Sequence, residues 1–332
     1  MDTKTKTSAI VWAIDPLENE VKPHPALVSK LVKMAKLSNI DIQPVYLLGI
    51  PSTEPKKSEN ESGLARFIED TEKMAEVYLR ELGVINARKI KILLSESSSH
   101  GTKPSSHLHA RKDKVEQLIK CAEDLNAPFI VVSSHGRTGV QRLVLGSFAE
   151  QLLLHAPCPV LFLTHESDTA FNETETSFKR VLFATDFSQT SRVGFEKFLT
   201  LAQAFKIEVT LFHMVTLPGA ALDSGSGIPV VIPDDYFPSQ VAWAKEEGAR
   251  WLSLAQARDL HSHLIILDEG VALNIGEIIL SIAQREKIGL VALTSVNGPL
   301  SSVVMGSVAR DVFRRNRFPV WAYGPQSLHL TT

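Results

Sequence analysis

The sequence predicts two tandem α/β domains, each with a five-stranded parallel sheet covered by helices on both faces. Three observations predict this architecture. The chain has 332 residues, more than the roughly 100–200 residues of one domain. Its second half repeats motifs of the first half. In each half, short apolar runs alternate with segments in which apolar residues recur at helical spacing, which is typical of a parallel sheet buried on both faces.

The repeat is visible as residue pairs that recur 160 positions later in the chain. The repeated pairs are Gly146-Ser147 with Gly306-Ser307, and Pro159-Val160 with Pro319-Val320. Near the start of each half, an apolar run ends in an aspartate, Asp15 or Asp186, here with an offset of 171. Repeats of this kind indicate two copies of one fold. We expect two superimposable domains, residues 1–165 and 178–325, related by an approximate two-fold axis and not merged into one ten-stranded sheet.

Each strand is expected where an apolar run lies between turn residues or polar segments. The expected strands are 9–14, 42–48, 89–94, 129–133 and 159–163 in the first copy, and 180–185, 207–213, 263–267, 289–294 and 319–323 in the second. The later helices of the first copy are expected near 113–126 and 147–155. A polar linker covers 166–177. Two further polar segments, 51–62 and 223–238, follow the second strand of each copy and are interpreted either as lids or as mobile surface loops.

One segment of the first copy has the features of a phosphate-binding loop. The apolar strand that ends at Ser133 leads into a loop with Gly136, and Gly146-Ser147 then opens a helix. Glycines let the backbone approach a phosphate closely. The first turn of a helix offers free N–H groups and the positive end of the helix dipole. Ser147 can cap that helix or donate its hydroxyl to a phosphate oxygen.

These motifs resemble the universal stress protein family. Its ATP-binding members carry Gly, two residues, Gly, nine residues and then Gly-Ser or Gly-Thr. Here nine residues separate Gly136 from Gly146-Ser147, and Ser133 stands where the family has its first glycine. The segments His155–Val160 and Ala184–Ser188 also resemble the family. The resemblance covers most of the chain. It implies flavodoxin-like domains that pair through edge strands as an intrachain pseudo-dimer, with further homodimer formation left open.

The resemblance implies a site for ATP or AMP in the first copy, with Mg²⁺ as an option. In the family, the aspartate after the first strand lies near the base of the nucleotide, a role that would pass to Asp15. The alternative is a turn residue before Pro16. The candidate binding residues are Asp15, Ser133, His135, Gly136, Arg137, Gly146 and Ser147. His135 could act as an acid or base, or shape the loop by hydrogen bonds.

The second copy retains less of the motif. With a constant offset of 160, Ser133 corresponds to Leu293 and Gly136 to Val296. Valine strongly disfavours the positive φ angles that glycine can adopt. A shifted alignment could rebuild the turn with Asn297-Gly298. We therefore expect a structural role or a different ligand for this copy, with Asp186, Gly306 and Ser307 as secondary site candidates.

Enzyme motifs are absent from the sequence. It has no Gly-x-x-x-x-Gly-Lys-Ser/Thr loop and no Gly-x-Ser-x-Gly elbow. The preferred hypothesis is a non-catalytic stress-response regulator that binds an adenine nucleotide. The alternatives are a nucleotide-free scaffold for protein partners, which the sequence does not identify, and a weak ATPase.

Other polar clusters are interpreted without a ligand. Two histidine groups, one of them in a serine-rich stretch, lack the further ligands that a metal site needs; they are His100, His107 and His109, and His261 with His263. We read them as solvated loop histidines. The basic residues Arg314, Arg315 and Arg317 end a helix, where they complement its dipole. Nucleic-acid binding, the alternative, lacks an aromatic stacking platform.

Composition points to a cytoplasmic protein. The formal net charge is −2, so it indicates no bulk attraction to nucleic acid or to a membrane. No stretch reaches the roughly 20 apolar residues of a membrane span, and the start of the chain lacks the apolar core of a signal peptide. The two cysteines, Cys121 and Cys158, fit a reducing compartment and are expected as buried thiols, with a disulfide as the alternative.

Overall fold

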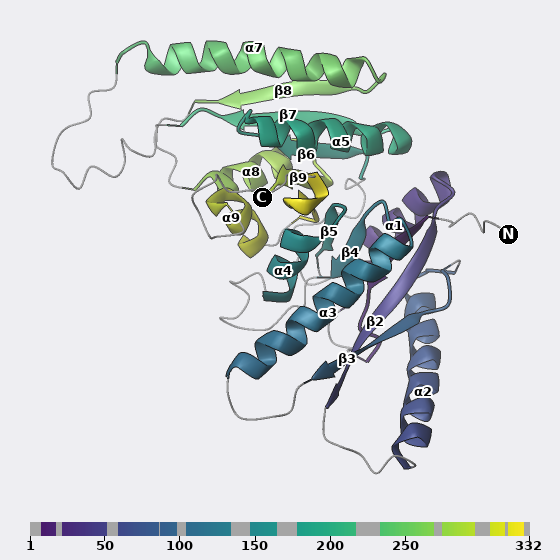
Figure 1. Ribbon diagram of the computed structural model, residues 1–332. Coiled ribbons are helices and arrows are strands. Elements are labelled where there is room, and N and C mark those ends of the chain that lie inside the picture. Colours follow the sequence, from purple (N-terminus) through teal and green to yellow (C-terminus); the bar gives the residue numbers. More distant parts are fainter. Residues whose placement is uncertain are drawn as a thin grey trace, which may run out of the picture.

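The computed structural model shows an α/β protein with two similar halves (Figure 1). The structure describes residues 8–17, 22–51, 59–85, 87–97, 104–133, 147–164, 178–216, 233–268, 274–295, 306–315 and 318–328. Candidate site residues His135, Gly136, Arg137 and Gly146 lie outside the described residues.

Among its described residues, the first half has five strands that alternate with four helices. The strands are β1 (Ala9–Ala13), β2 (Asp41–Pro51), β3 (Lys91–Ser97), β4 (Ile130–Ser133) and β5 (Val160–Leu163). The helices are α1 (Pro25–Leu37), α2 (Glu59–Glu81), α3 (Pro104–Asp124) and α4 (Ser147–His155). Within this half the described strands run parallel, in the order β3-β2-β1-β4-β5.

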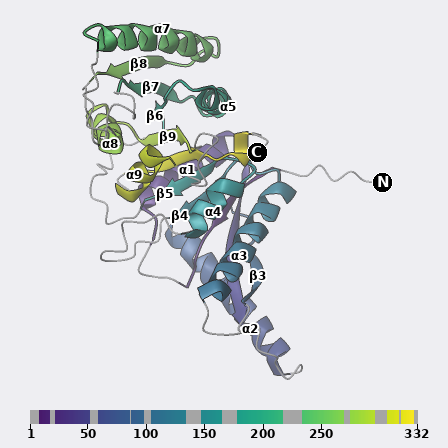
Figure 2. The same ribbon diagram turned by 60° about the vertical axis from the view of Figure 1, so that its left-hand side comes forward.

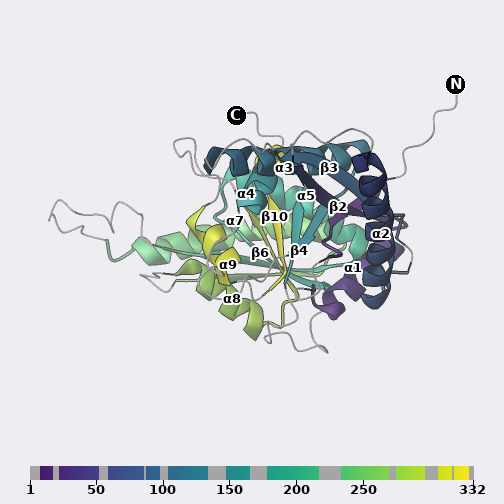
Figure 3. The same cartoon turned by 90° about the horizontal axis from the view of Figure 1, so that it is seen from below.

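The second half repeats this order of elements. Its strands are β6 (Arg180–Ala184), β7 (Glu208–Met214), β8 (Ser262–Leu267), β9 (Leu290–Thr294) and β10 (Val320–Tyr323). Its helices are α5 (Gln189–Phe205), α7 (Tyr236–Gln256), α8 (Ile275–Arg285), α9 (Ser307–Arg315) and the short η2 (Gln326–Leu328). The order β8-β7-β6-β9-β10 mirrors that of the first half. Seen from below, the strands lie between helices on both sides (Figure 3).

The two halves join into one ten-stranded sheet, because β5 and β10 pair antiparallel. The expectation of pairing through edge strands is confirmed. The expectation that the halves would not form a continuous sheet was wrong: an edge strand offers unpaired N–H and C=O groups, and the other copy satisfies them. Figure 2 shows the resulting long molecule, with α7 at one end and α2 at the other.

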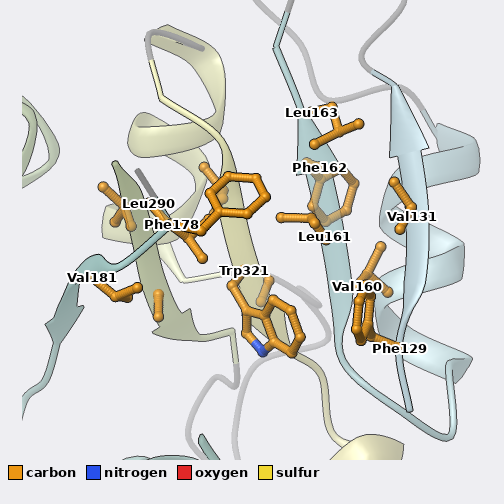
Figure 4. Packing of buried hydrophobic residues seen from close by; sticks show 14 of the residues in the cluster. Phe129, Val131, Val160, Leu161, Phe162, Leu163, Phe178, Val181, Leu290 and Trp321 are labelled. Carbon is orange, nitrogen blue, oxygen red and sulfur yellow. The ribbon is translucent and has the colours of Figure 1, made fainter. Parts of the chain in front are cut away.

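Aromatic side chains fill the junction between the halves (Figure 4). Phe129 of the first half lies 4.8 Å from Trp321 of the second, and Phe162 lies 4.7 Å from Phe313, measured between ring centroids. Gly324 follows β10 so closely against α4 that a Cβ on it would overlap the backbone oxygen of Leu153. The halves therefore share one apolar core.

Three expected loop segments are partly helical. Helix α2 begins at Glu59 and α7 at Tyr236, inside the polar segments 51–62 and 223–238. Helix α3 begins at Pro104, so His107 and His109 are helical and not loop residues. Proline suits the first turn of a helix, because the N–H that it lacks would have no partner there.

Both cysteines are free thiols, so the disulfide alternative is excluded. Cys121 is buried and Cys158 is partly buried. Burial raises the pKa of the Cys158 thiol to about 12, which keeps it protonated at neutral pH. Among the described helices, none combines the length and the apolar character needed to cross a membrane.

Candidate functional site

A cavity of about 620 Å³ opens at the carboxyl ends of β6, β7 and β9. Strand β6 lies between β7, the next strand in the chain, and β9, which comes three strands after β6. Successive strands are therefore added on one side of β6 up to β8 and on its other side from β9, so the strand order reverses at β6. In open parallel sheets, ligands bind outside the carboxyl ends of the strands at such a reversal.

Asp186, directly after β6, is held at the cavity by the turn that begins α5. Its Oδ1 accepts hydrogen bonds from the Ser188 backbone N–H at 2.9 Å and from the Ser191 hydroxyl at 2.6 Å. Ser188 caps α5, since its hydroxyl oxygen accepts from the Ser191 N–H at 3.2 Å. This cap satisfies an N–H that would otherwise lack a partner at the helix start. The carboxylate is therefore fixed in position.

The carboxyl group of Asp186 is ionised at neutral pH. Partial burial acts to raise its pKa, but the hydrogen bonds from Ser191 and Ser188 outweigh burial and hold the pKa below its ordinary value. Hydrogen bonds to the charged form favour ionisation. The cavity thus carries a fixed negative charge.

A second polar contact connects α5 to β9. The Ser191 and Thr294 hydroxyl oxygens lie 2.9 Å apart and share a hydrogen bond. This approach requires Gly194 one turn later, because a Cβ there would overlap Thr294 Cγ2. Asp186, Ser191 and Thr294 form a continuous polar network across the point of reversal.

Aromatic rings stand behind this network. Phe187 adopts φ 56°, in the left-handed region, which costs a non-glycine residue roughly 1–2 kcal/mol. Its N–H donates to Thr185 Oγ1 at 2.9 Å. Its ring is buried, with centroid distances of 4.7 Å to His213 and 5.1 Å to Trp251. Packing of the ring offsets the backbone strain.

His213 lines the cavity as a neutral imidazole. Burial lowers its pKa below the ordinary value, against the opposing effects of a hydrogen bond to Thr185 and the charge of Asp186. Nδ1 lies 2.9 Å from the Thr185 carbonyl oxygen. A carbonyl can only accept, so Nδ1 carries the proton and Nε2 is an acceptor.

Trp243 of α7 adds an accessible aromatic wall. It lies 6.1 Å from His213 between centroids and is 45% exposed. Aliphatic residues of α8 and β9 also line the cavity, including Ile275, Ile279 and Leu293. Gly306 and Ser307 bring the start of α9 to the cavity. A helix start offers free backbone N–H donors.

The secondary candidates Asp186, Gly306 and Ser307 thus lie around one cavity. Their role in binding a nucleotide stays a prediction. Ser191, Thr294, His213, Gln240 and Trp243 also line it and were not anticipated from the sequence. A sequence signal existed for Trp243, because it lies beside the buried stripe of α7 that contains Ala244 and Trp251.

In the first half, Asp15 follows β1 and Ser133 ends β4, its neighbour in the sheet. Asp15 Oδ1 accepts from the Leu17 N–H at 3.1 Å, so Asp15 does take part in a turn; its role at a nucleotide base stays a prediction. Ser147 begins α4. Burial, with the charge of Asp15 adding to it, raises the pKa of Tyr46 to about 12.

Strand register corrects the alignment of the two copies by one residue. Ala13 pairs with Val132, and the equivalent Ala184 pairs with Leu293. Ser133 therefore corresponds to Thr294 and not to Leu293. The sequence offset is 161 at this strand and 160 at Gly306, so the intervening loop is one residue shorter in the second copy. Hydrogen-bonded register fixes this position, which a gapless sequence comparison misses.

No group of three or more histidine, cysteine, aspartate or glutamate residues placed to hold a metal ion is found among the residues that the structure describes. His263, in β8, has its Nε2 3.2 Å from the Thr210 hydroxyl. Arg315, at the end of α9, contacts Glu277 at 3.2 Å and Asp311 at 3.4 Å. These polar groups therefore have partners within the protein.

One curated protein with a similar sequence is a universal stress protein. A curated universal stress protein of Methanocaldococcus jannaschii is 42% identical over 45 residues, 14% of this chain and 26% of that protein. The match spans about a quarter of that relative's length.

Two solved structures cover nearly the whole chain. A universal stress protein from Archaeoglobus fulgidus has a TM-score of 0.58 at 17% identity, over 96% of this chain and 98% of that chain. A protein of unassigned function from Pseudomonas aeruginosa PAO1 has a TM-score of 0.52 at 14% identity, over 97% and 95%. These likenesses support the fold. The model of the universal stress protein family matches residues 8–163 and 177–324, and the chain therefore belongs to the universal stress protein family, with two copies in tandem.

Proposed function

We propose that this protein is a non-catalytic stress-response regulator that binds ATP or AMP in residues 1–165 and signals by its binding state. The observation that carries the proposal is the arrangement at the carboxyl edge of the first half. Asp15 lies two residues after β1, Ser133 ends the neighbouring strand β4 at a reversal of strand order, and α4 begins at Ser147. In the second half, residues 178–325, the equivalent elements surround the cavity described above.

The charge of the first-half loops supports an anionic ligand. The segments that follow β2, β3 and β4 in the chain, 52–58, 98–103 and 134–146, carry five lysine or arginine residues: Lys56, Lys57, Lys103, Arg137 and Arg142. Cationic side chains and free helix-start N–H groups are the partners that phosphate oxygens require.

The proposal favours binding over turnover. Phosphoryl transfer needs positioned metal ligands, a charge clamp on the transferring group and a residue that orients the nucleophile. Asp15 would serve the base end of the nucleotide. Binding that stabilises the ground state and the transition state equally does not accelerate the reaction. Any ATP hydrolysis should stay far below the roughly 1–1000 s⁻¹ of ordinary enzymes.

Calorimetric titration of ATP and AMP tests the proposal. Gly136→Val should abolish most of the nucleotide binding, because valine strongly disfavours the positive φ angles that glycine can adopt. Ser147→Ala and Ser307→Ala form a matched pair, since each removes the hydroxyl of the first residue of an equivalent helix, α4 or α9. Ser147→Ala should weaken binding, whereas Ser307→Ala should hardly change it. Equal losses from Gly136→Val and Ser307→Ala would contradict the placement in the first half. ATP turnover of several per second, lost in Gly146→Val, would contradict the non-catalytic proposal.

A further inference from the structure

The cavity of the second half has the opposite electrostatic character to a phosphate site. None of its described lining residues is a lysine or an arginine. Its one histidine, His213, is neutral at pH 7, because burial lowers its pKa. The fixed charge at its edge is the carboxylate of Asp186, ionised as a result of its hydrogen bonds. A phosphate ester would therefore approach a negative charge with no cationic side chain from these residues to compensate it.

The sequence of the second half extends this contrast beyond the described residues. The segments after β7, β8 and β9 in the chain are 217–232, 269–273 and 296–305. They contain no lysine, arginine or histidine, and they include Asp223 and Glu269. The corresponding segments of the first half carry five cationic residues, as given above. The segments after corresponding strands therefore differ in charge between the two halves, with cationic residues in the first half and none in the second.

The cavity instead suits an uncharged ring system that donates hydrogen bonds. A volume of about 620 Å³ falls within the roughly 300–1,000 Å³ of sites for small ligands. Trp243 and the aliphatic side chains Ile275 and Ile279 line the cavity and offer apolar surface to a planar ligand. The Asp186 carboxylate and His213 Nε2 are acceptors. They require N–H or O–H groups on the ligand.

One feature of the cavity favours an anion, the start of α9 at Ser307. A helix start attracts negative charge only within its first turn. The same N–H groups can equally donate to a neutral carbonyl, ring nitrogen or hydroxyl oxygen. The α9 start is therefore compatible with a neutral ligand, while the Asp186 carboxylate opposes an anionic one.

We propose that the second-half cavity binds a planar nitrogen heterocycle of nucleoside size, bearing N–H donors and no phosphate. The two copies then recognise different ligands. The first takes a phosphorylated nucleotide, and the second takes a neutral compound in a cavity whose described lining has no lysine or arginine.

Trp243 provides a local reporter for the test. The other tryptophans, Trp12, Trp251 and Trp321, are almost completely buried, whereas Trp243 is partly exposed at the cavity. Adenosine and AMP serve as probes, titrated into the full chain and followed by tryptophan fluorescence. The same titrations with Trp243→Phe identify the signal that comes from this cavity. Repeating them in Gly136→Val separates this proposal from the first-half site, whose failure would leave the Trp243 signal unchanged.

The expected result is a Trp243-dependent signal with adenosine at least about tenfold tighter than AMP, since juxtaposed like charges are strongly unfavourable. Gln240→Lys, a substitution on α7 that places a cation in the cavity lining, should make AMP binding at the Trp243-dependent signal about tenfold tighter. Asp186→Asn should also reduce the ratio by which adenosine binds more tightly than AMP at this cavity. The proposal is overturned if the Trp243-dependent signal reports AMP binding as tight as adenosine binding, or if neither probe changes that signal. It is equally overturned if Gln240→Lys folds normally and the AMP affinity read from the Trp243-dependent signal stays as it was.

Discussion

Phe187 offers a sharp test of the turn that positions Asp186, because its backbone and its side chain affect stability in opposite directions. The backbone has φ 56°, and the ring is buried against His213, Trp243 and Trp251. Phe187→Ala removes the ring and keeps the strain. Large-to-small changes of this type cost about 3–5 kcal/mol, and we expect a loss of about 3 kcal/mol in the free energy of unfolding.

Phe187→Gly removes the ring and the strain together. Relief of a left-handed conformation is worth about 1–2 kcal/mol, and the added freedom of the unfolded chain takes back about 0.4–1 kcal/mol. The glycine variant should therefore be as stable as the alanine variant or up to about 1.6 kcal/mol more stable. Phe195 is the matched control, since it is fully buried within helix α5. There glycine should be about 1 kcal/mol less stable than alanine.

Urea unfolding followed by fluorescence measures all four variants. The reasoning predicts that the difference between glycine and alanine changes sign, or at least vanishes, between position 195 and position 187. If glycine is less stable than alanine by the same amount at both positions, Phe187 is not strained in solution and the proposed fixing of Asp186 is wrong.

Two further predictions concern the junction and the pH dependence. Gly324→Ala should destabilise the protein and separate the halves, because the new Cβ overlaps the Leu153 backbone oxygen. The control Gly63→Ala lies on α2, with no atom within 4 Å of the added Cβ, and should instead stabilise the protein by up to about 1 kcal/mol. Thermal unfolding of the two variants measures both effects. In the folded protein the pKa of His213 lies below its ordinary value of about 6.5. As the pH falls, the unfolded chain therefore binds a proton at this histidine before the folded protein does. The contribution of His213 to stability is thus present above about pH 6.5 and lost as the pH falls. Because the pKa of Asp186 in the folded protein is also lowered, its contribution to stability is likewise lost as the pH falls below about 4. Urea midpoints at pH 7 and pH 5 should differ less in His213→Gln than in the wild type; an unchanged difference would mean that His213 is not held neutral.

Strand positions followed closely from the sequence because buried parallel strands are short, continuous apolar runs. Apart from β2 and β3, each strand begins and ends within one residue of its expected position. The beginning of α3 was missed because the segment from Pro104 to Ala110 is polar and lacks an apolar stripe. The merger of the two sheets depends on which edge strands meet, and an apolar run such as 160–163 does not specify its neighbour.

The candidate site was only partly predictable. Asp186 and the Gly306-Ser307 pair carry motifs that the sequence repeats, so the residues were found although the cavity was not. Ser191 and Thr294 are more than a hundred positions apart and meet only because β6 and β9 are neighbours in the sheet. The correspondence of Ser133 with Thr294 depends on a one-residue difference in loop length, which becomes visible once the strands are in register.

The central claim is that two copies of one fold bind different ligands in one chain. Equilibrium dialysis of the wild-type protein with labelled AMP and labelled adenosine, alone and together, tests it most directly. At AMP concentrations below those at which AMP enters the second-half cavity, the account predicts about one molecule of AMP per chain, and adenosine then adds about one more without displacing it. Binding of two molecules of AMP per chain with equal affinity, or full displacement of one ligand by the other, would contradict it.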